Sequence, residues 1–292
     1  MKSILIIIFL AVGQVSFANS IDSIRSDRDV LTFLNQIGNR QYFKNQEPIR
    51  ILSTDTLKLK MGCDSLFEKL QIRNWEKVDF NNDKRTDLIV TLWWYNFDIF
   101  IAIDKGNNTF QLIRLSRSGS EYCLLAKPVI QNNKQLLVFY RIDNVYNQPI
   151  KNVFDFKMSL KIDTLIYKFG SFVEYQKSSS QYDITEIQFH TSSGWSGISP
   201  VYKLTQLNSK EWDLKANSTP KLISSQSMLA LISLIDYMNV KTLFNRYMVA
   251  HTDAATMYMK IYFKDGTVKE IEDYGMEGTF SLRLLYELFS KL

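Results

Sequence analysis

The sequence predicts an α+β protein in two parts: a β-rich, mostly antiparallel domain over residues 19–177 and a smaller α+β domain over residues 178–292. In the first part, short apolar runs recur and turn-forming residues separate them, which is typical of antiparallel strands. In the second part, apolar residues at helical spacing stand on both sides of a β-hairpin signal. The polar segment 176–181 has no periodicity and is the expected linker.

The first part begins with helical patterns and continues with strands. Ser26 can cap a helix over residues 27–37 that ends at Gly38, and a second short helix is expected around residues 66–70. Apolar or alternating runs then predict a series of strands. They cover residues 87–94, 99–103, 110–115, 124–130, 136–142 and 154–167.

The second part mixes strands and helices. Asp265-Gly266 between two apolar runs is a strong hairpin signal, because these residues accept the left-handed backbone of a two-residue turn. We expect its two strands over residues 257–263 and 268–274. The other expected elements are strands over 184–189 and 200–207, and helices over 225–238, over 242–247 and from about 281 onward.

The first eighteen residues have the pattern of a secretory signal peptide. Lys2 gives a positive start, residues 4–12 are almost wholly apolar, and small residues end at Ala18. The apolar run is about half of the roughly 20 residues that a membrane-spanning helix needs. We therefore expect cleavage near Ala18, no membrane span in the mature chain, and a periplasmic or secreted bacterial protein.

The composition indicates a folded chain and argues against a nucleic-acid partner. Of the 292 residues, 46% are apolar and 13% aromatic, which supports a sizeable core and excludes global disorder. The formal net charge is +5, and the basic residues are spread along the chain. A nucleic-acid binder usually gathers them in one patch or stripe.

The chain has two cysteines, Cys63 and Cys123. In an oxidising compartment an even number favours a disulfide bond, here one that closes a loop of about 60 residues. The alternative is a pair of buried free thiols, because cysteine packs well as a small apolar side chain. The spacing alone leaves both interpretations open.

The most specific chemical signal lies at residues 79–87, between two apolar runs. Side chains with oxygen recur at its first, third, fifth and ninth positions, and calcium takes roughly six to eight oxygen ligands from such loops. The expected ligands are Asp79, Asn81, Asp83, Asp87 and the main-chain carbonyl of Arg85. The alternative is a turn in which the Asp and Asn side chains bond to the nearby backbone.

This segment resembles the Asp-x-Asn-x-Asp-Gly-x-x-Asp-Leu loop of the FG-GAP and related β-propeller or adhesion repeats. The resemblance implies a Ca²⁺ ion with a structural role. It occurs once, so it does not predict a propeller, which needs several blades. Lys84 stands where that family usually has Gly, at a turn position that tends to need a left-handed backbone.

A second resemblance rests on a series of landmarks in the second part. These are Trp195-Ser-Gly197-Ile-Ser199-Pro200-Val-Tyr202, then Tyr247, Thr252-Asp253, Asp265-Gly266 and Asp273-Tyr274-Gly275. Their order resembles a bacterial exported domain of unknown function with the hallmark Cys-x-Gly-x-Cys-Pro-x-Tyr. Trp195 and Ser199 replace both hallmark cysteines, so a disulfide, redox or metal role of that pair does not carry over. The resemblance implies the fold and export, and no activity.

Aromatic residues and one histidine complete the candidate sites. Alternation along a strand would place Trp93 and Tyr95 on one face and Trp94 on the other, which suits either core packing or a platform for a partner. His251 with Asp253 could form a base and its orienting carboxylate, although a surface loop is the commoner arrangement. No esterase, zinc-protease or nucleotide-binding signature is present in the sequence.

We therefore expect an exported, non-enzymatic binding protein with a protein or carbohydrate partner in the envelope or outside the cell. Its expected contact residues are Trp93, Trp94, Tyr95, Trp195, Tyr202, His251 and Asp253. One alternative is a hydrolase of envelope or extracellular polymers that uses His251, Asp253 and carboxylates brought together by folding. Another is a structural component of an envelope assembly.

Overall fold

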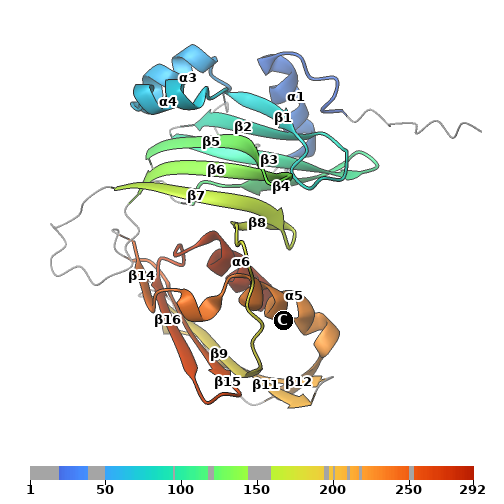
Figure 1. Cartoon of the computed structure of the whole chain (residues 1–292), viewed down its shortest axis with the longest axis vertical. Helices are drawn as coiled ribbons and strands as arrows, with labels where there is room; N and C mark the ends of the chain where they lie inside the picture. Colours follow the sequence, from blue (N-terminus) through green and yellow to red (C-terminus); the bar gives the residue numbers. More distant parts are fainter. Residues whose placement is uncertain are drawn as a thin grey trace, which may run out of the picture.

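A computed structural model of the chain has the α+β class that the sequence predicts, with mostly antiparallel sheets and a few helices (Figure 1). The structure describes residues 20–38, 50–94, 96–117, 122–143, 159–193, 197–199, 201–208, 211–216, 219–249 and 253–292. The expected signal peptide lies outside these residues. Within them, no helix combines the length and the apolar character needed to cross a membrane.

Two four-stranded antiparallel sheets form the first part of the chain and share one core. The first sheet has the order β1-β2-β3-β4, with β1 (Trp75–Val78), β2 (Asp87–Trp94), β3 (Asn96–Gly106) and β4 (Thr109–Arg114). The second has the order β5-β6-β7-β8, with β5 (Tyr122–Gln131), β6 (Lys134–Asp143), β7 (Ser159–Lys168) and β8 (Ser171–Glu174). Alternate side chains of both sheets, such as Ile101 and Phe139, are fully buried between them.

The strands predicted for the first part are confirmed, with ends that shift by a few residues. The strand expected over 154–167 is described from Ser159 onward as β7, and residues 144–158 lie outside the described chain. The sequence does not predict β1 and β8. Each has four residues, which is too short for alternation to stand out.

The first helix, α1 (Asp27–Ile37), is confirmed and packs on the other face of the first sheet. Its N-terminus forms a capping box: the hydroxyl of Ser26 accepts the N–H of Asp29 (3.3 Å), and the Asp29 carboxylate accepts the N–H of Ser26 (2.9 Å). The apolar side chains between helix and sheet include Val30, Phe33, Leu34, Leu88 and Val90.

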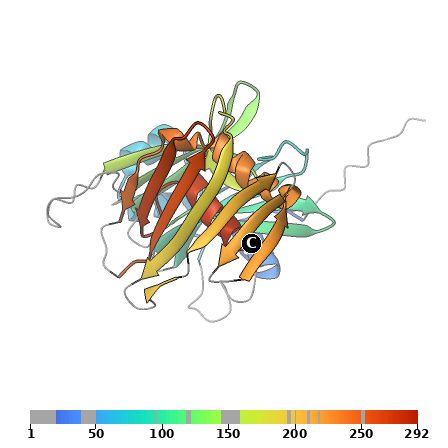
Figure 2. The ribbon, with the colours of Figure 1, turned by 90° about the horizontal axis from the view of Figure 1, so that it is seen from below.

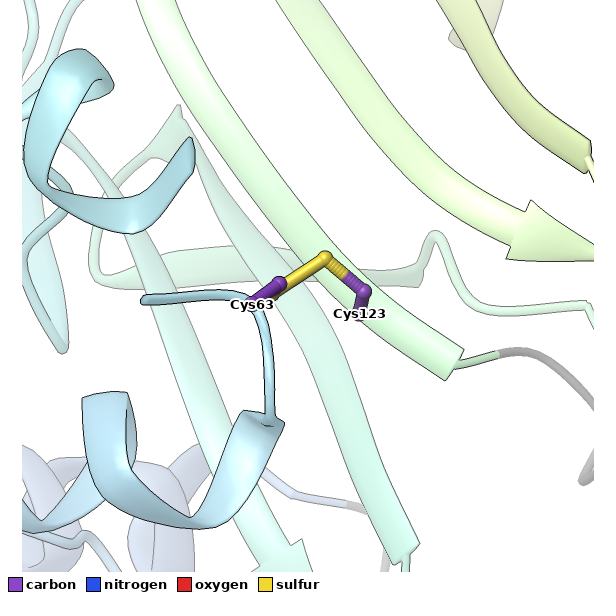
Figure 3. The surroundings of a disulfide bond; sticks show 2 residues. All are labelled: Cys63 and Cys123. Atoms are coloured by element: carbon purple, nitrogen blue, oxygen red, sulfur yellow. A yellow bond between two sulfur atoms is a disulfide. The ribbon is translucent and has the colours of Figure 1, made fainter. Parts of the chain in front are cut away.

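A disulfide bond between Cys63 and Cys123 ties the junction of α3 (Thr54–Met61) and α4 (Asp64–Leu70) to β5, with the two Cα atoms 5.9 Å apart (Figure 3). Of the two interpretations that the sequence leaves open, the structure has the disulfide and not the pair of free thiols. A small apolar cluster surrounds the bond and includes Leu57, Phe67 and Leu125. The helix around residues 66–70 is confirmed as α4, whereas α3 is not predicted by the sequence.

The second part is built on one large sheet with the order β13-β12-β11-β9-β15-β16-β14 and with β10 beside β9. The strands are β9 (Ile184–Ser193), β10 (Gly197–Ile198), β11 (Tyr202–Asn208), β12 (Glu211–Ala216), β13 (Thr219–Ser224), β14 (Arg246–Met248), β15 (Thr256–Phe263) and β16 (Val268–Tyr274). The helices α5 (Ser225–Tyr237) and α6 (Phe280–Phe289) cover the face of this sheet that points toward the first part of the chain (Figures 1 and 2).

The hairpin at Asp265-Gly266 and the helices α5 and α6 are confirmed. The helix expected over residues 242–247 is wrong. A single 3-10 turn, η1 (Val240–Thr242), is followed by β14, which pairs in parallel with β16 at the edge of the sheet. Tyr247 is buried there, so tertiary packing outweighs the helical spacing of the local apolar residues. The strands β12 and β13 are also missing from the prediction.

The segment expected as a linker has no helix or strand, but hydrogen bonds hold it to the end of α5. The hydroxyl of Tyr237 accepts the N–H of Gln176 (3.1 Å), and the carboxylate of Asp236 accepts the N–H of Tyr182 (2.9 Å). The side chain of Asn239 accepts the N–H of Ser180 (2.8 Å). This segment is therefore fastened to the second part over its whole length.

Candidate functional site

Asp87 is the most buried member of the candidate calcium loop, with no exposed surface at the start of β2. One carboxylate oxygen accepts the N–H of Phe80 and the other the N–H of Asp104, both at 2.8 Å. Burial raises the pKa of Asp87 to about 7; the two N–H bonds lower it, and the carboxylates of Asp83 and Asp79 raise it further.

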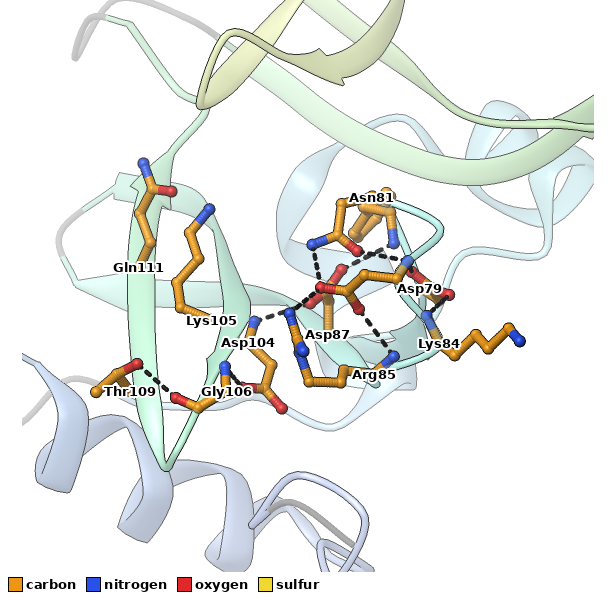
Figure 4. A network of polar contacts seen from close by, with 12 residues as sticks. Asp79, Asn81, Lys84, Arg85, Asp87, Asp104, Lys105, Gly106, Thr109 and Gln111 are labelled. Atoms are coloured by element: carbon orange, nitrogen blue, oxygen red, sulfur yellow. Dashed lines mark hydrogen bonds and ion pairs between the residues drawn. The ribbon is translucent and has the colours of Figure 1, made fainter. Parts of the chain in front are cut away.

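The rest of the loop is a dense set of side-chain to backbone hydrogen bonds (Figure 4). Asp79 accepts the N–H of Asp83 (3.2 Å) on one oxygen and the N–H of Lys84 (2.9 Å) on the other. The Asn81 side-chain oxygen accepts the N–H of Asp83 as well (3.1 Å). Asp83 in turn accepts the N–H of Arg85 (2.9 Å) and pairs with its guanidinium (2.5 Å).

Lys84 has a φ of +69°, so the position that is usually glycine in the resembling loops is left-handed here too. Asn82 also has a positive φ, of +56°. Asn tolerates this region well, whereas lysine is held there at a cost of about 1 kcal/mol. The hydrogen bond from its N–H to Asp79 is the contact that fixes it.

The arrangement brings all five predicted ligand residues into one turn. Their oxygen donors fit the chemistry that calcium prefers, but here the carboxylates accept backbone hydrogens rather than converge on one point. Among the residues that the structure describes, no group of three or more His, Cys, Asp or Glu side chains could hold a metal. The contacts are those of the alternative interpretation, a turn stabilised by its own side chains.

Trp93, the described member of the predicted aromatic platform, is half-buried near the end of β2. Its backbone exchanges two hydrogen bonds with Arg50 (3.0 and 2.9 Å), and the amine of Lys60 lies 4.8 Å from its ring centre. The side chain of Trp94 and all of Tyr95, Trp195 and His251 lie outside the described residues. Asp253 is exposed and has a φ of +62°. Because His251 lies outside the described residues, its pairing with Asp253 stays a prediction.

Tyr202 borders a cavity of about 390 Å³ between the large sheet and the end of α6. Its ring stacks on Phe189 (5.0 Å between ring centres), which stacks in turn on Phe289 (4.1 Å). The other lining residues are His190, Thr191, Ser199, Leu214, Met257, Met276, Tyr286, Ser290 and Leu292. The sequence singles out Tyr202 but not the cavity, because its walls come from four strands and one helix that lie far apart in the sequence.

Behind this cavity lies a buried pair that sequence reasoning does not find. The hydroxyl of Tyr286 donates to Asp273 (2.8 Å), which also accepts the N–H groups of Glu277 (3.2 Å) and Gly278 (3.0 Å). Burial raises the pKa values of both Asp273 and Tyr286. A side chain at Gly278 would meet Tyr247 at 2.7 Å, so the loop after Asp273 requires a glycine there.

The comparisons with known proteins address the end of the chain. Residues 214–292 match the model of a family described as "Domain of unknown function (DUF6438)". The match begins after the segment 195–202, so it does not extend to the replaced cysteine hallmark. Searches of curated proteins and of solved structures find no match. A DUF6438 domain, a domain of unknown function, thus occupies the C-terminal residues from Leu214 to Leu292.

Proposed function

We propose that this protein is an exported, non-catalytic binding protein whose ligand enters the cavity beside Tyr202. The observation that carries the proposal is the cavity itself, which has about 390 Å³ and mainly apolar walls with a few polar groups. Small-molecule pockets in proteins typically enclose roughly 300–1,000 Å³ and have this kind of lining. The signal-like N-terminus supports export.

The lining indicates the class of ligand. Of the described residues that border the cavity, none is Asp, Glu, Lys or Arg, while Phe189, Tyr202 and Phe289 present a run of stacked rings. An aromatic or aliphatic group can bury against these rings, and the hydroxyl of Thr191 can bond to a polar end. The ligand is therefore an uncharged or weakly polar molecule, or such a group on a larger partner.

A hydrolase has less support. Among the titratable groups at the cavity, Tyr286 donates its hydroxyl hydrogen to Asp273 behind it, and the ring of Tyr202 stacks on Phe189. His190 also borders the cavity, but its ring stacks against Tyr258 (4.8 Å between ring centres). A catalytic acid or base needs direct access to its substrate. The hydrogen bond between Tyr286 and Asp273 suits a structural role in the cavity wall better than proton transfer to a substrate.

A structural Ca²⁺ ion at Asp79–Asp87 is the second part of the proposal. It is supported by the oxygen donors of the five residues in one turn and by the left-handed backbone of Lys84. Its role would be to hold the connection between β1 and β2.

The binding proposal can be tested with the uncharged fluorescent probe N-phenyl-1-naphthylamine on the mature chain. We expect saturable binding, weakened at least about tenfold by Thr191→Trp, which fills the cavity from β9. Gln188→Trp is the matched control, because alternation places this residue of the same strand on the opposite face. Equal binding by both variants would exclude the cavity as the site.

A further inference from the structure

Three aromatic rings that border the cavity beside Tyr202 form one continuous stack. The ring of Phe189 on β9 is in the middle, and the Tyr202 ring of β11 stacks on it with 5.0 Å between ring centres and 10° between the planes. The Phe289 ring of α6 also stacks on Phe189, at 4.1 Å and 12°. Both neighbours could not share one face of Phe189 without overlapping, so the middle ring is covered on both faces.

Tyr202 is the end of the stack that the protein leaves partly uncovered. Phe189 and Phe289 are only 6% and 4% exposed, whereas Tyr202 is half-buried. Because β11 lies between β9 and β12 in the sheet, the face of the Tyr202 ring that points away from Phe189 is on the β12 side. Leu214 of β12 also borders the cavity. The open end of the stack therefore faces a part of the cavity with an aliphatic wall.

Two methionines add side chains that favour an aromatic guest. Met257 of β15 and Met276, which follows β16, both border the cavity. A thioether makes favourable contacts with the edge of an aromatic ring, and its flexible chain adapts to the shape of the guest. The described lining residues include no Asp, Glu, Lys or Arg. A charged ligand would lose its hydration there without an ionic partner in these walls, so the lining suits an uncharged ring.

We propose that the ligand of this cavity is an uncharged, planar aromatic molecule that stacks on Tyr202 as the next ring of the series. This inference rests on the proposed function and narrows its ligand class. A flexible aliphatic chain would bury against the apolar walls, but it would not gain the stabilisation that stacked rings add beyond the area that they bury. The hydroxyl of Thr191 can bond to a polar substituent of the ring. Tyr202 is then the residue that determines specificity.

The test is isothermal titration calorimetry of the full mature chain with 2-naphthol and with decahydro-2-naphthol. The two compounds share their carbon skeleton and single hydroxyl, but only 2-naphthol is flat and aromatic. We expect 2-naphthol to bind at least about threefold more tightly, and Thr191→Trp to abolish measurable binding of both compounds. Equal affinities that Thr191→Trp abolishes would overturn the aromatic class and leave the binding cavity standing. Binding of neither compound, or binding that Thr191→Trp does not change, would contradict the proposed function itself.

Variants of Tyr202 test its role in the preference for 2-naphthol. Tyr202→Phe keeps the ring and should keep the preference, whereas Tyr202→Leu should bring the two affinities within about 1.5-fold of each other. The control is Tyr258→Leu, because Tyr258 alternates with the core residues Met257 and Met259 along β15 and so lies on the opposite face of the sheet. The readout is a ratio of two affinities, so a loss of stability that weakens both compounds alike does not imitate the result. An unchanged preference in Tyr202→Leu would overturn the proposed stacking on Tyr202.

Discussion

Glu174 at the end of β8 caps α6 at Ser281. One of its carboxylate oxygens accepts the N–H (2.9 Å) and the hydroxyl (2.5 Å) of Ser281, and the other accepts the N–H of Phe280 (2.6 Å). The N–H of Leu282 bonds to the side chain of Thr279 (3.0 Å), so the open donors of the first turn are satisfied. A residue of the first part thereby fixes the start of a helix in the second.

Phe280 extends this connection into the core of the first part. Its ring is buried against Phe139 (5.7 Å between ring centres), and the guanidinium of Arg117 lies 5.2 Å from the ring centre of Phe280. Carboxylate and ring together couple the two sheets of the first part to α6. We therefore expect the two parts to unfold together.

Glu174→Ala should lower the free energy of unfolding by about 1–2 kcal/mol, because two buried N–H groups lose a charged acceptor at a helix N-terminus. Urea unfolding, followed by fluorescence and by circular dichroism, measures the change. The control is Glu270→Ala, which removes only a surface ion pair with Lys260 and should cost less than about 0.5 kcal/mol. Equal losses in the two variants would contradict the capping role.

Removal of the disulfide should have a larger effect. The bond closes a sequence separation of 60 residues, for which the chain-entropy model gives about 4 kcal/mol. The double variant Cys63→Ala/Cys123→Ala and the reduced wild-type protein should therefore show similar losses in urea unfolding. A loss below about 1 kcal/mol would mean that the cluster around Leu57 and Phe67 holds α3 and α4 without the bond.

The pKa of Asp87 predicts a pH dependence of stability. In the folded chain it is raised to about 7 by burial, whereas the unfolded value is near 4. The folded state thus holds a proton that the unfolded state has lost, so this group lowers stability as pH rises from about 4 to 7. The upper bound of the loss is about 4 kcal/mol.

Thermal melts in EDTA across this pH range measure the effect. Asp87→Asn cannot ionise, so its melting temperature should fall less between pH 4 and pH 7 than that of the wild type. The slope is the readout, which makes the comparison valid even if the variant is less stable throughout. Equal changes of melting temperature with pH in the variant and the wild type would contradict a raised pKa of Asp87.

Local chemistry made much of the fold predictable. Ser26 before a helical pattern and Asp265-Gly266 between strands act within a few residues, and both gave the observed elements. The spacing of apolar residues predicts the wrong element where contacts between residues far apart in the sequence determine the structure. Residues 242–247 have helical spacing, yet parallel pairing of β14 with β16 makes part of them a strand.

The candidate sites show the same contrast between local and distant contacts. The loop at Asp79–Asp87 could be predicted because its contacts are local, including the left-handed position of Lys84. The cavity beside Tyr202 could not be predicted, since it joins residues of separate strands to α6. Of the cavity beside Tyr202, the sequence singled out only that one tyrosine. The periodicity of apolar residues does not show which strand lies next to which helix.

The calcium loop gives the last prediction. Ca²⁺ that binds only the folded chain stabilises it, and for a millimolar site at about 10 mM Ca²⁺ the gain is roughly 1.4 kcal/mol, or about 3 °C in melting temperature. Asp83→Ala should abolish the shift. Because ligand oxygens must be deprotonated, the shift should be larger at pH 8 than at pH 6, across the pKa of Asp87 near 7.

The variant Lys84→Gly distinguishes a loop that binds calcium from a turn without an ion. Glycine accepts the φ of +69° without strain and removes a positive charge beside the carboxylates, so both the EDTA melting temperature and the calcium shift should rise. Glu270→Ala, a carboxylate on another sheet, should leave the shift unchanged. If Lys84→Gly raises the melting temperature in EDTA and calcium adds nothing at either pH, the loop is a turn held by its own side chains.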